Sequence, residues 1–553
     1  MFVRLKSTSN KQIKQVQIVE SYRKNGEPRQ RVLYSCGKAF IGEELDNLIQ
    51  MAELKKVKMQ QEVQTSLLSP EETVRITMES KRRKEETKAK CNPLDLKEEQ
   101  RVSMGIYEVY GELYQQLGFD KLFSSRRKVA KRNLFHITMA RIANPQSKRA
   151  SVMDLSSKFG VHLNLQSVYR MMDAIDDNFI EKLNKLAYKQ AKKIQPDGIT
   201  CTLYDCTSLY FESFKEDELK RNGYSKDNKF NQPQVLLSLL STSEGLPIGY
   251  ELFSGNTYEG HTLDSTINKL KKKYKIQKII IAGDAGMLNK KNIQKLEDEG
   301  IEYVLGAKIK SMTKEIRKKI INTKRYKDAA KNDLLYDKIR RINLAGDKDL
   351  IVSYSEKRAK KNRKDREKNV EKLKTKLSKN KNPKEAISNY GYKKYLDLVG
   401  KSKIVLNEDK IKEDEQWDGL FGVISNIKDM SNDDILGIYH RLWKIEECFR
   451  VTKHDLRVRP IFHWTPQKIK AHIAICFMAL VLVKNLSYMV SMRYENMSVE
   501  RIRRELDSSQ ATMFRDMKTG RRYSIPSKAT EWAEKIYNLV GVKISKQGFK
   551  IVD

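Results

Sequence analysis

The pattern of apolar and polar residues changes after residue 198 to short, strand-like runs. Residues 200–212, 234–242 and 246–253 are short runs rich in β-branched, aromatic and other apolar residues, and a Ser-Glu-Gly turn at residues 243–245 separates the last two. Runs of this length bounded by turn residues are typical of β-strands. The pattern therefore predicts a three-stranded antiparallel meander.

Helical and strand patterns alternate after this meander. We expect a helix at 261–274, a strand at 278–282, a helix at 290–299, a strand at 303–307 and a further strand within 421–430. A meander followed by strand, helix and strand is the order of a ribonuclease H-like fold. The sequence therefore predicts a mixed α/β sheet with helices.

Changes of pattern divide the chain into six predicted regions. Residues 356–384 hold 14 Lys or Arg against 4 acids, which indicates a charged helical excursion within an insertion; a solvated arm and a DNA clamp both remain open for it. The regions are a basic β-hairpin with a helical connector (1–97), a helical DNA-binding domain (98–195), the first part of the α/β core (196–307), an insertion domain (308–420), the second part of the core (421–484) and a C-terminal helical region (485–553).

The charge of the chain indicates a polyanionic partner. Lys and Arg number 108 against 71 Asp and Glu in 553 residues, a formal charge of +37, while 39% of residues are hydrophobic. This excess is carried by a foldable protein, so nucleic acid is favoured as the partner. The apolar run at 473–483 is too short to span a bilayer, and no signal peptide is evident. We expect a cytoplasmic, nucleoid-associated protein with no membrane partner.

The six cysteines predict neither disulfides nor a zinc site. Only Cys201 and Cys206 are close in sequence, and their odd separation on one strand turns their side chains to opposite faces. We expect reduced thiols.

One segment, residues 438–453, carries charged and aromatic residues at helical spacing. Tyr439, Trp443, Glu446, Arg450 and Lys453 follow at steps of four or three, so a continuous helix would place them on one stripe. An acid among cations and rings can hold a metal while its neighbours bind a phosphodiester. The alternative is an ordinary amphipathic helix with solvated charges.

Two further acids complete a candidate metal site. Asp205 lies within the first core strand, where burial of a lone carboxylate is costly, and Asp284 follows a buried strand at the carboxyl end, where ligand sites collect. Glu446 is the third acid. Its neighbour Glu447 is the rival ligand, but it lies about 100° away around the helix from the stripe. Three carboxylates suit Mg²⁺ or Mn²⁺ and can hold two ions for phosphoryl transfer.

These residues resemble the DDE transposases of bacterial insertion sequences, in the branch with a Tyr-Arg-Glu-Lys signature helix. Tyr439 and Lys453 lie seven residues before and after Glu446, as in that signature. The signature arginine position is Leu442 here, with Arg441 beside it. The segments Gly-Tyr-Ser-Lys-Asp at 223–227 and Arg-Pro-Ile-Phe-His at 459–463 also resemble one subgroup of the family.

The resemblance implies a ribonuclease H-like core with an insertion before the catalytic glutamate. It implies that Asp205, Asp284 and Glu446 bind two Mg²⁺ ions, for which Mn²⁺ could substitute. Tyr439 and Lys453 would contact phosphates near the cut; Arg441 is the candidate for the missing arginine, and Arg450 is added from the stripe. The expected partners are terminal inverted repeats and target DNA, bound by a homodimer.

Two other functions remain open. A nuclease on the same fold would use the same acids without strand transfer. A non-catalytic descendant would bind DNA alone.

Overall fold

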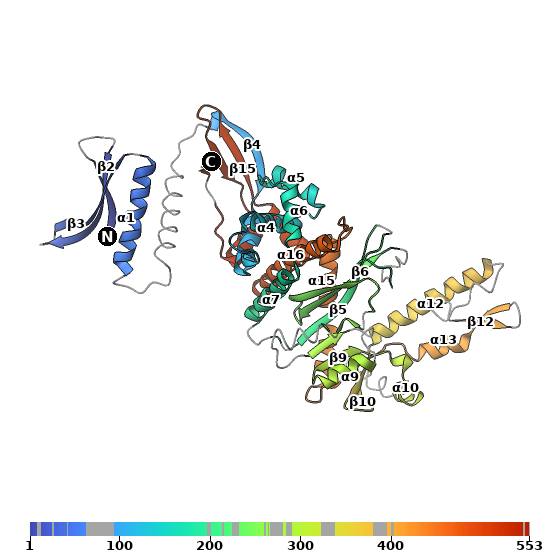
Figure 1. Cartoon of the computed structure of the whole chain (residues 1–553). Coiled ribbons are helices and arrows are strands. Elements are labelled where there is room, and N and C mark those ends of the chain that lie inside the picture. The colour runs from blue at the N-terminus through green and yellow to red at the C-terminus, as the bar shows by residue number, and fades with distance from the viewer. Residues whose placement is uncertain are drawn as a thin grey trace. The chain divides into compact units, whose positions relative to one another are not determined.

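The structure is a computed structural model whose chain forms two compact units, each described by itself (Figure 1). One unit comprises Met1–Arg101, Ala511–Lys528 and Ser545–Asp553, and the other comprises Val102–Gln510 and Ala529–Ile544. The described residues are 1–7, 13–24, 27–40, 42–61, 93–195, 199, 201–212, 215–223, 232–258, 261–263, 265, 280–283, 290–321, 338–379, 395–399, 403–545 and 548–551.

The first unit contains the predicted N-terminal hairpin. β2 (Ile13–Lys24) and β3 (Glu27–Phe40) pair antiparallel, and a strand that we did not expect, β1 (Phe2–Ser7), extends them to three strands. The helix α1 (Glu43–Gln61) packs its apolar side chains on this sheet, with Leu45 and Ala52 against Val16 and Ala39.

A second sheet of this unit corrects the prediction of a wholly helical C-terminus. Its strand order is β17-β16-β15-β4, from β17 (Phe549–Ile551), β16 (Arg522–Pro526), β15 (Gln510–Asp516) and β4 (Leu96–Ser103). Helices α17 (Val499–Asp507) and α18 (Glu531–Val540) supply the helical part of residues 485–553.

The second unit begins with the expected helices, which surround one long buried helix. They are α3 (Gly105–Gln116), α4 (Lys128–Ala143), α5 (Lys148–Phe159), α6 (Leu165–Asp173) and α7 (Asp177–Ile194). The long helix, α16 (Pro466–Arg493), is apolar enough to cross a membrane by length and composition, but 83% of its apolar 18-residue stretch is buried within the protein. It packs on α4, α6 and β7, which makes it a core helix.

An eight-stranded mixed sheet forms the rest of this unit, in the order β10-β11-β14-β9-β8-β5-β6-β7. The predicted meander is β5 (Cys201–Tyr210), β6 (Gln234–Thr242) and β7 (Pro247–Ser254), and β8 (Ile280–Gly283) and β9 (Glu302–Gly306) run parallel to β5. Helix α9 (Lys290–Asp298) also occurs where it was expected, whereas most of 261–274 lies outside the described residues.

The two faces of the sheet are covered by different helices. Leu203 and Leu209 of β5 pack in one apolar cluster with α16, whereas Tyr204 and Cys206 pack in another with α9. This alternation follows from the two-residue period of a strand. Cys201 and Cys206 therefore lie on opposite faces, and the five cysteines in the described part are free thiols.

Part of the range expected to form an insertion belongs to this sheet. β10 (Lys338–Asn343) and β11 (Asp349–Tyr354) pair with each other, and β11 pairs with β14 (Leu420–Ser425). The excursion proper starts after Tyr354, which lies opposite Leu420. It contains α12 (Glu356–Lys379), β12 (Leu396–Val399), β13 (Lys403–Leu406) and α13 (Glu408–Glu415).

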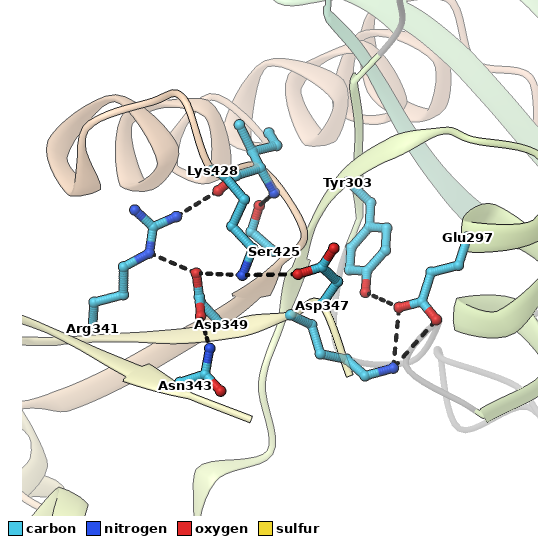
Figure 2. Close-up of polar contacts among 10 residues, drawn as sticks. Glu297, Tyr303, Arg341, Asn343, Asp347, Asp349, Ser425 and Lys428 are labelled. Carbon is cyan, nitrogen blue, oxygen red and sulfur yellow. Dashed lines mark hydrogen bonds and ion pairs between the residues drawn. The ribbon is translucent and has the colours of Figure 1, made fainter. Parts of the chain in front are cut away.

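A polar network secures this edge of the sheet (Figure 2). The buried Asp349 carboxylate accepts hydrogen bonds from Arg341 at 2.8 Å, Lys428 at 3.1 Å and Asn343 at 3.1 Å. Arg341 also donates to the main-chain carbonyl of Ile427. The charge of this buried acid is therefore balanced within the protein.

Candidate functional site

Asp205 lies in the middle of β5, half-buried among fully buried neighbours. Its main-chain neighbour Cys206 donates an N–H to Oδ1 at 2.7 Å. By alternation it shares a face with Leu203 and Thr207, as the sequence predicted, and this face is the one covered by α15 and α16.

The strand before Asp284 lies beside β5, but Asp284 itself lies outside the described residues. β8 runs parallel to β5 with Ala282 opposite Leu203, and it ends at Gly283. Leu203 and Ala282 each precede a candidate acid by two residues. The position of Asp284 in the site therefore stays a prediction.

The segment expected to be one helix is divided into three parts. α14 (Asn432–His440) is followed by its C-cap Arg441, α15 (Trp443–Arg450) begins two residues later, and Val451–Asp455 form a π-helical turn. Within the first junction, Leu442 N donates to Tyr439 O at 3.0 Å and Lys444 N donates to Arg441 O at 2.9 Å, the short three-residue spacing. The single stripe from Tyr439 to Lys453 is therefore wrong, because both junctions change the helical phase.

Glu446 and Glu447 have different surroundings. Glu446 is exposed, and no ion pair is found for it within the described chain. Glu447 instead accepts from the buried Lys484 at 2.9 Å and lies 3.7 Å from Arg450. Glu447 thus has a structural partner within the described chain, whereas the assignment of Glu446 as a metal ligand stays a prediction.

Helix α15 packs on the face of the sheet to which Asp205 belongs by alternation. It contacts β5 and β6, and Ile445 and Cys448 join the apolar cluster that contains Leu203. Cys448 Sγ donates to the carbonyl of Gly245 at 3.3 Å, and Lys444 pairs with Glu244 at 3.0 Å. The turn between β6 and β7 therefore fixes the helix that carries Glu446 on the face that carries Asp205.

The four predicted DNA-contacting residues lie around this helix. The Tyr439 ring packs 5.0 Å from the ring of Phe421, and Arg441 lies 3.5 Å from Glu244 at the end of α14. Arg450 is exposed on α15, and Lys453 is partly exposed in the π-helical turn.

Two neighbouring residues have opposite surroundings. Leu442, at the position of the signature arginine, is buried with the core, as its helical spacing from the apolar Ile438 and Ile445 predicts, whereas the Trp443 side chain is 55% exposed. The Trp443 ring lies 5.4 Å from Lys444 Nζ on the surface of α15.

The donor set fits a hard divalent cation. Asp205 and Glu446 supply carboxylate oxygens, the ligands that Mg²⁺ and Mn²⁺ prefer. Burial raises the pKa of Cys448 to about 11 and that of Cys201 to about 12, so neither thiol is a thiolate at neutral pH. Within the residues that the structure describes, which exclude Asp284, no group of three His, Cys, Asp or Glu is gathered at metal-binding distance.

Sequence reasoning missed a cluster of basic residues beside α5 and α16. Arg141, Lys148, Arg457 and Arg459 line a cavity together with His463 and His472. The Arg-Pro-Ile-Phe-His segment at 459–463 was noticed only as a family resemblance, and nothing in the sequence pairs it with Lys148.

Comparison with known families identifies most of the second unit. Residues 196–482 match the family described as Transposase DDE domain, and residues 3–63 match the IS1634 family transposase, N-terminal domain. A search of curated proteins gave no match.

Two solved structures show weaker similarity. A piggyBac transposase synaptic complex with hairpin DNA has a TM-score of 0.34 at 11% identity, covering 73% of this chain and 76% of that one. A Mos1 transposase paired-end complex with the left transposon end has a TM-score of 0.15 at 13% identity, covering 44% and 70%. Both scores are low, so the assignment depends on the family match.

Proposed function

Because the chain belongs to the Transposase DDE domain family, we propose that it is an insertion-sequence transposase that cleaves DNA at the ends of its element and joins the 3′-hydroxyl ends to target DNA. Membership of the family implies DNA cleavage, strand transfer and the use of a divalent metal. The proposal extends this to terminal inverted repeats as substrate, a homodimer in the DNA complex and the cytoplasm as location.

One observation carries the assignment of the site. Helix α15, which bears Glu446, packs on the face of β5 that bears Asp205. The strand order β7-β6-β5-β8-β9, with the first three antiparallel and the last two parallel to β5, further supports a ribonuclease H-like core. We assign Asp205, Glu446 and Asp284 as the metal ligands.

Two Mg²⁺ ions, when bound, would activate the attacking oxygen and stabilise the leaving oxygen of a phosphodiester. The protein's residues have separate tasks. Asp205 and Glu446 hold their carboxylates on a rigid strand and on a helix fixed by Glu244 and Gly245. The cations Arg441, Arg450 and Lys453 near α15 attract DNA phosphates, and the ring of Tyr439 orients the strand close to the cut.

The first experiment tests cleavage. We expect Asp205→Asn to abolish Mg²⁺-dependent cutting of DNA that carries the inverted repeats flanking the reading frame, while DNA binding is retained. Asp298→Asn, an exposed acid on α9, serves as the matched control and should cut like the wild type. Equal cutting by Asp205→Asn and the wild type would reject the enzymatic site.

The second experiment separates a transposase from a nuclease. A pre-cleaved repeat end is incubated with plasmid target, and joined products are measured. A nuclease would cut the first substrate and leave no joined product in the second.

A further inference from the structure

A basic pocket lies where α4, the start of α5, α16 and the loop after the π-helical turn meet. Its volume is about 350 Å³, and five cationic side chains line it: Arg141, Lys148, Arg149, Arg457 and Arg459. Every described residue of the lining is neutral or basic, since none is Asp or Glu. We call this cavity the basic pocket.

Two of its cations are buried without an acidic partner. Lys148 is 2% exposed and Arg141 is 3% exposed, and neither forms an ion pair in the described part of the chain. Arg141 donates to the carbonyls of Gln146, Leu456 and Arg457, while its Nε is buried with no hydrogen-bond partner. Burying a cation is costly unless an opposite charge meets it. An anionic ligand would supply that charge.

The surroundings of Lys148 disfavour its charged form. Its Nζ lies 3.2 Å from His472 Nδ1, and burial, with the charge of Arg141, lowers the pKa of Lys148 to about 7. Burial also lowers the pKa of His463 to about 3 and that of His472 well below its usual value. Both imidazoles are therefore neutral at physiological pH and leave the cations uncompensated.

The helix α5 adds donors to the same cavity. It begins at Lys148, and its cap Ser147 accepts from Ala150 N at 3.2 Å. Ser147, Lys148, Arg149 and Ala150 all line the pocket, so the first-turn N–H groups and the positive end of the helix dipole lie beside it.

The pocket is connected to the strand that carries Asp205. The Arg459 guanidinium carbon lies 4.9 Å from the centre of the Tyr210 ring, at the end of β5. Tyr210 is five residues from Asp205. At about 3.4 Å per residue this is about 17 Å along the strand, the length of roughly five base pairs of duplex.

We propose that the basic pocket binds a phosphate group of the DNA backbone, several base pairs from the cleavage site. The proposal rests on the proposed function, because it assigns a further contact to the same DNA. The shared chemistry is a phosphate group; the charge of +37 and the contact with β5 favour DNA over free phosphate as its source.

The test measures affinity of the full chain for a short duplex DNA, without divalent metal, at several salt concentrations. Lys148→Met should weaken binding by at least about tenfold, the effect of a lost charge-assisted hydrogen bond. The logarithm of the DNA association constant falls linearly with the logarithm of the salt concentration, and Lys148→Met should make this slope shallower by about 0.9 for each phosphate contact that is lost. Lys158→Met, an exposed lysine at the other end of α5, is the matched control and should change affinity by less than about threefold.

A second variant and a second readout separate binding from folding. Arg457→Gln changes an exposed side chain of the pocket and should also weaken DNA binding. The melting temperature of Lys148→Met without DNA should equal or exceed that of the wild type, because a buried unpaired cation is removed. Unchanged DNA affinity in both variants overturns the proposal, as does loss of affinity only in parallel with a lowered melting temperature.

Inorganic phosphate distinguishes the source of the ligand. It should raise the melting temperature of the wild type but not of Lys148→Met, and it should compete with DNA. Stabilisation by phosphate with unchanged DNA affinity in both variants would assign the pocket to a free anion and reject DNA. Normal DNA binding by the pocket variants, combined with loss of cleavage in Asp205→Asn, would reject the pocket and leave the proposed function intact.

Discussion

Two buried charged regions of the second unit differ in how their charge is balanced. Around Asp349, one buried carboxylate meets Arg341, Lys428 and Asn343 from separate segments, so the network is complete within the protein (Figure 2). In the basic pocket, Lys148 and Arg141 are as deeply buried, but within the described residues neither has an acidic partner. A buried charge with its partner supports the fold, whereas one without a partner indicates a ligand.

Glu446 and Glu447 on α15 differ in the same way, and their substitution should give the largest effect on DNA cleavage. Glu446→Gln should reduce cleavage by at least about 100-fold, which corresponds to about 2.7 kcal/mol of transition-state stabilisation, and should leave the melting temperature unchanged. Glu447→Gln should do the reverse, because it removes the partner of the buried Lys484. Cleavage rates and thermal melting of the two variants are compared directly. If Glu447→Gln lost activity while its melting temperature stayed unchanged, Glu447 and not Glu446 would be assigned as the metal ligand.

The Asp349 network should respond strongly to loss of its acid. Asp349→Asn should destabilise this edge of the sheet by about 2–4 kcal/mol, because Arg341 and Lys428 lose their shared counter-charge. Hydrogen exchange of the β11 amides measures this locally. The matched control is the fully exposed Asp347, whose Oδ1 lies 3.8 Å from Lys428 Nζ. Asp347→Asn should change the free energy of exchange by less than about 0.5 kcal/mol. If the two substitutions changed the free energy of hydrogen exchange equally, the distinction between the buried Asp349 and the exposed Asp347 would be rejected.

The smallest expected effect is the pH dependence of the basic pocket. The pKa of Lys148 is about 7 in the folded protein and higher when the chain unfolds, so between these values the unfolded state binds more protons. Its contribution to stability should therefore rise with pH above 7, by about 2 kcal/mol between pH 7 and 9. The melting advantage of Lys148→Met should shrink over this range. An advantage that is constant with pH would mean that Lys148 does not titrate there.

The sequence predicted the core strands better than their boundaries with the insertion. The runs that became β5, β6, β7 and β9 are strongly apolar, and burial on both faces of a sheet requires that composition. β10 was missed because Lys338, Arg340 and Arg341 give it the charge of the neighbouring excursion. Its membership of the sheet depends on pairing with β11, a contact that local composition does not encode.

The sequence predicted the elements of the candidate site but not their geometry. Asp205 was selected from its place within a core strand and Glu446 from helical spacing, and α15, which carries Glu446, packs on the face of β5 that carries Asp205. The junction at Leu442 was not predicted, because the helical spacing of the segment is compatible with one continuous helix and does not encode the tight turn between α14 and α15. The basic pocket was missed for a related reason: lysine is seldom buried, and residues 141–149 meet 457–459 only in three dimensions.

The charged excursion leaves and re-enters the sheet at a single point. Tyr354 and Leu420 are paired neighbours, Ser355 N donates to the carbonyl of Gly419 at 3.0 Å, and a side chain at Gly419 would meet the Tyr354 ring at 2.6 Å. Topologically, the whole arm is a greatly enlarged hairpin turn. Relatives could therefore lengthen, shorten or exchange it without shifting the register of β11 against β14, and a short glycine-containing turn grafted at this neck should give a minimal catalytic core.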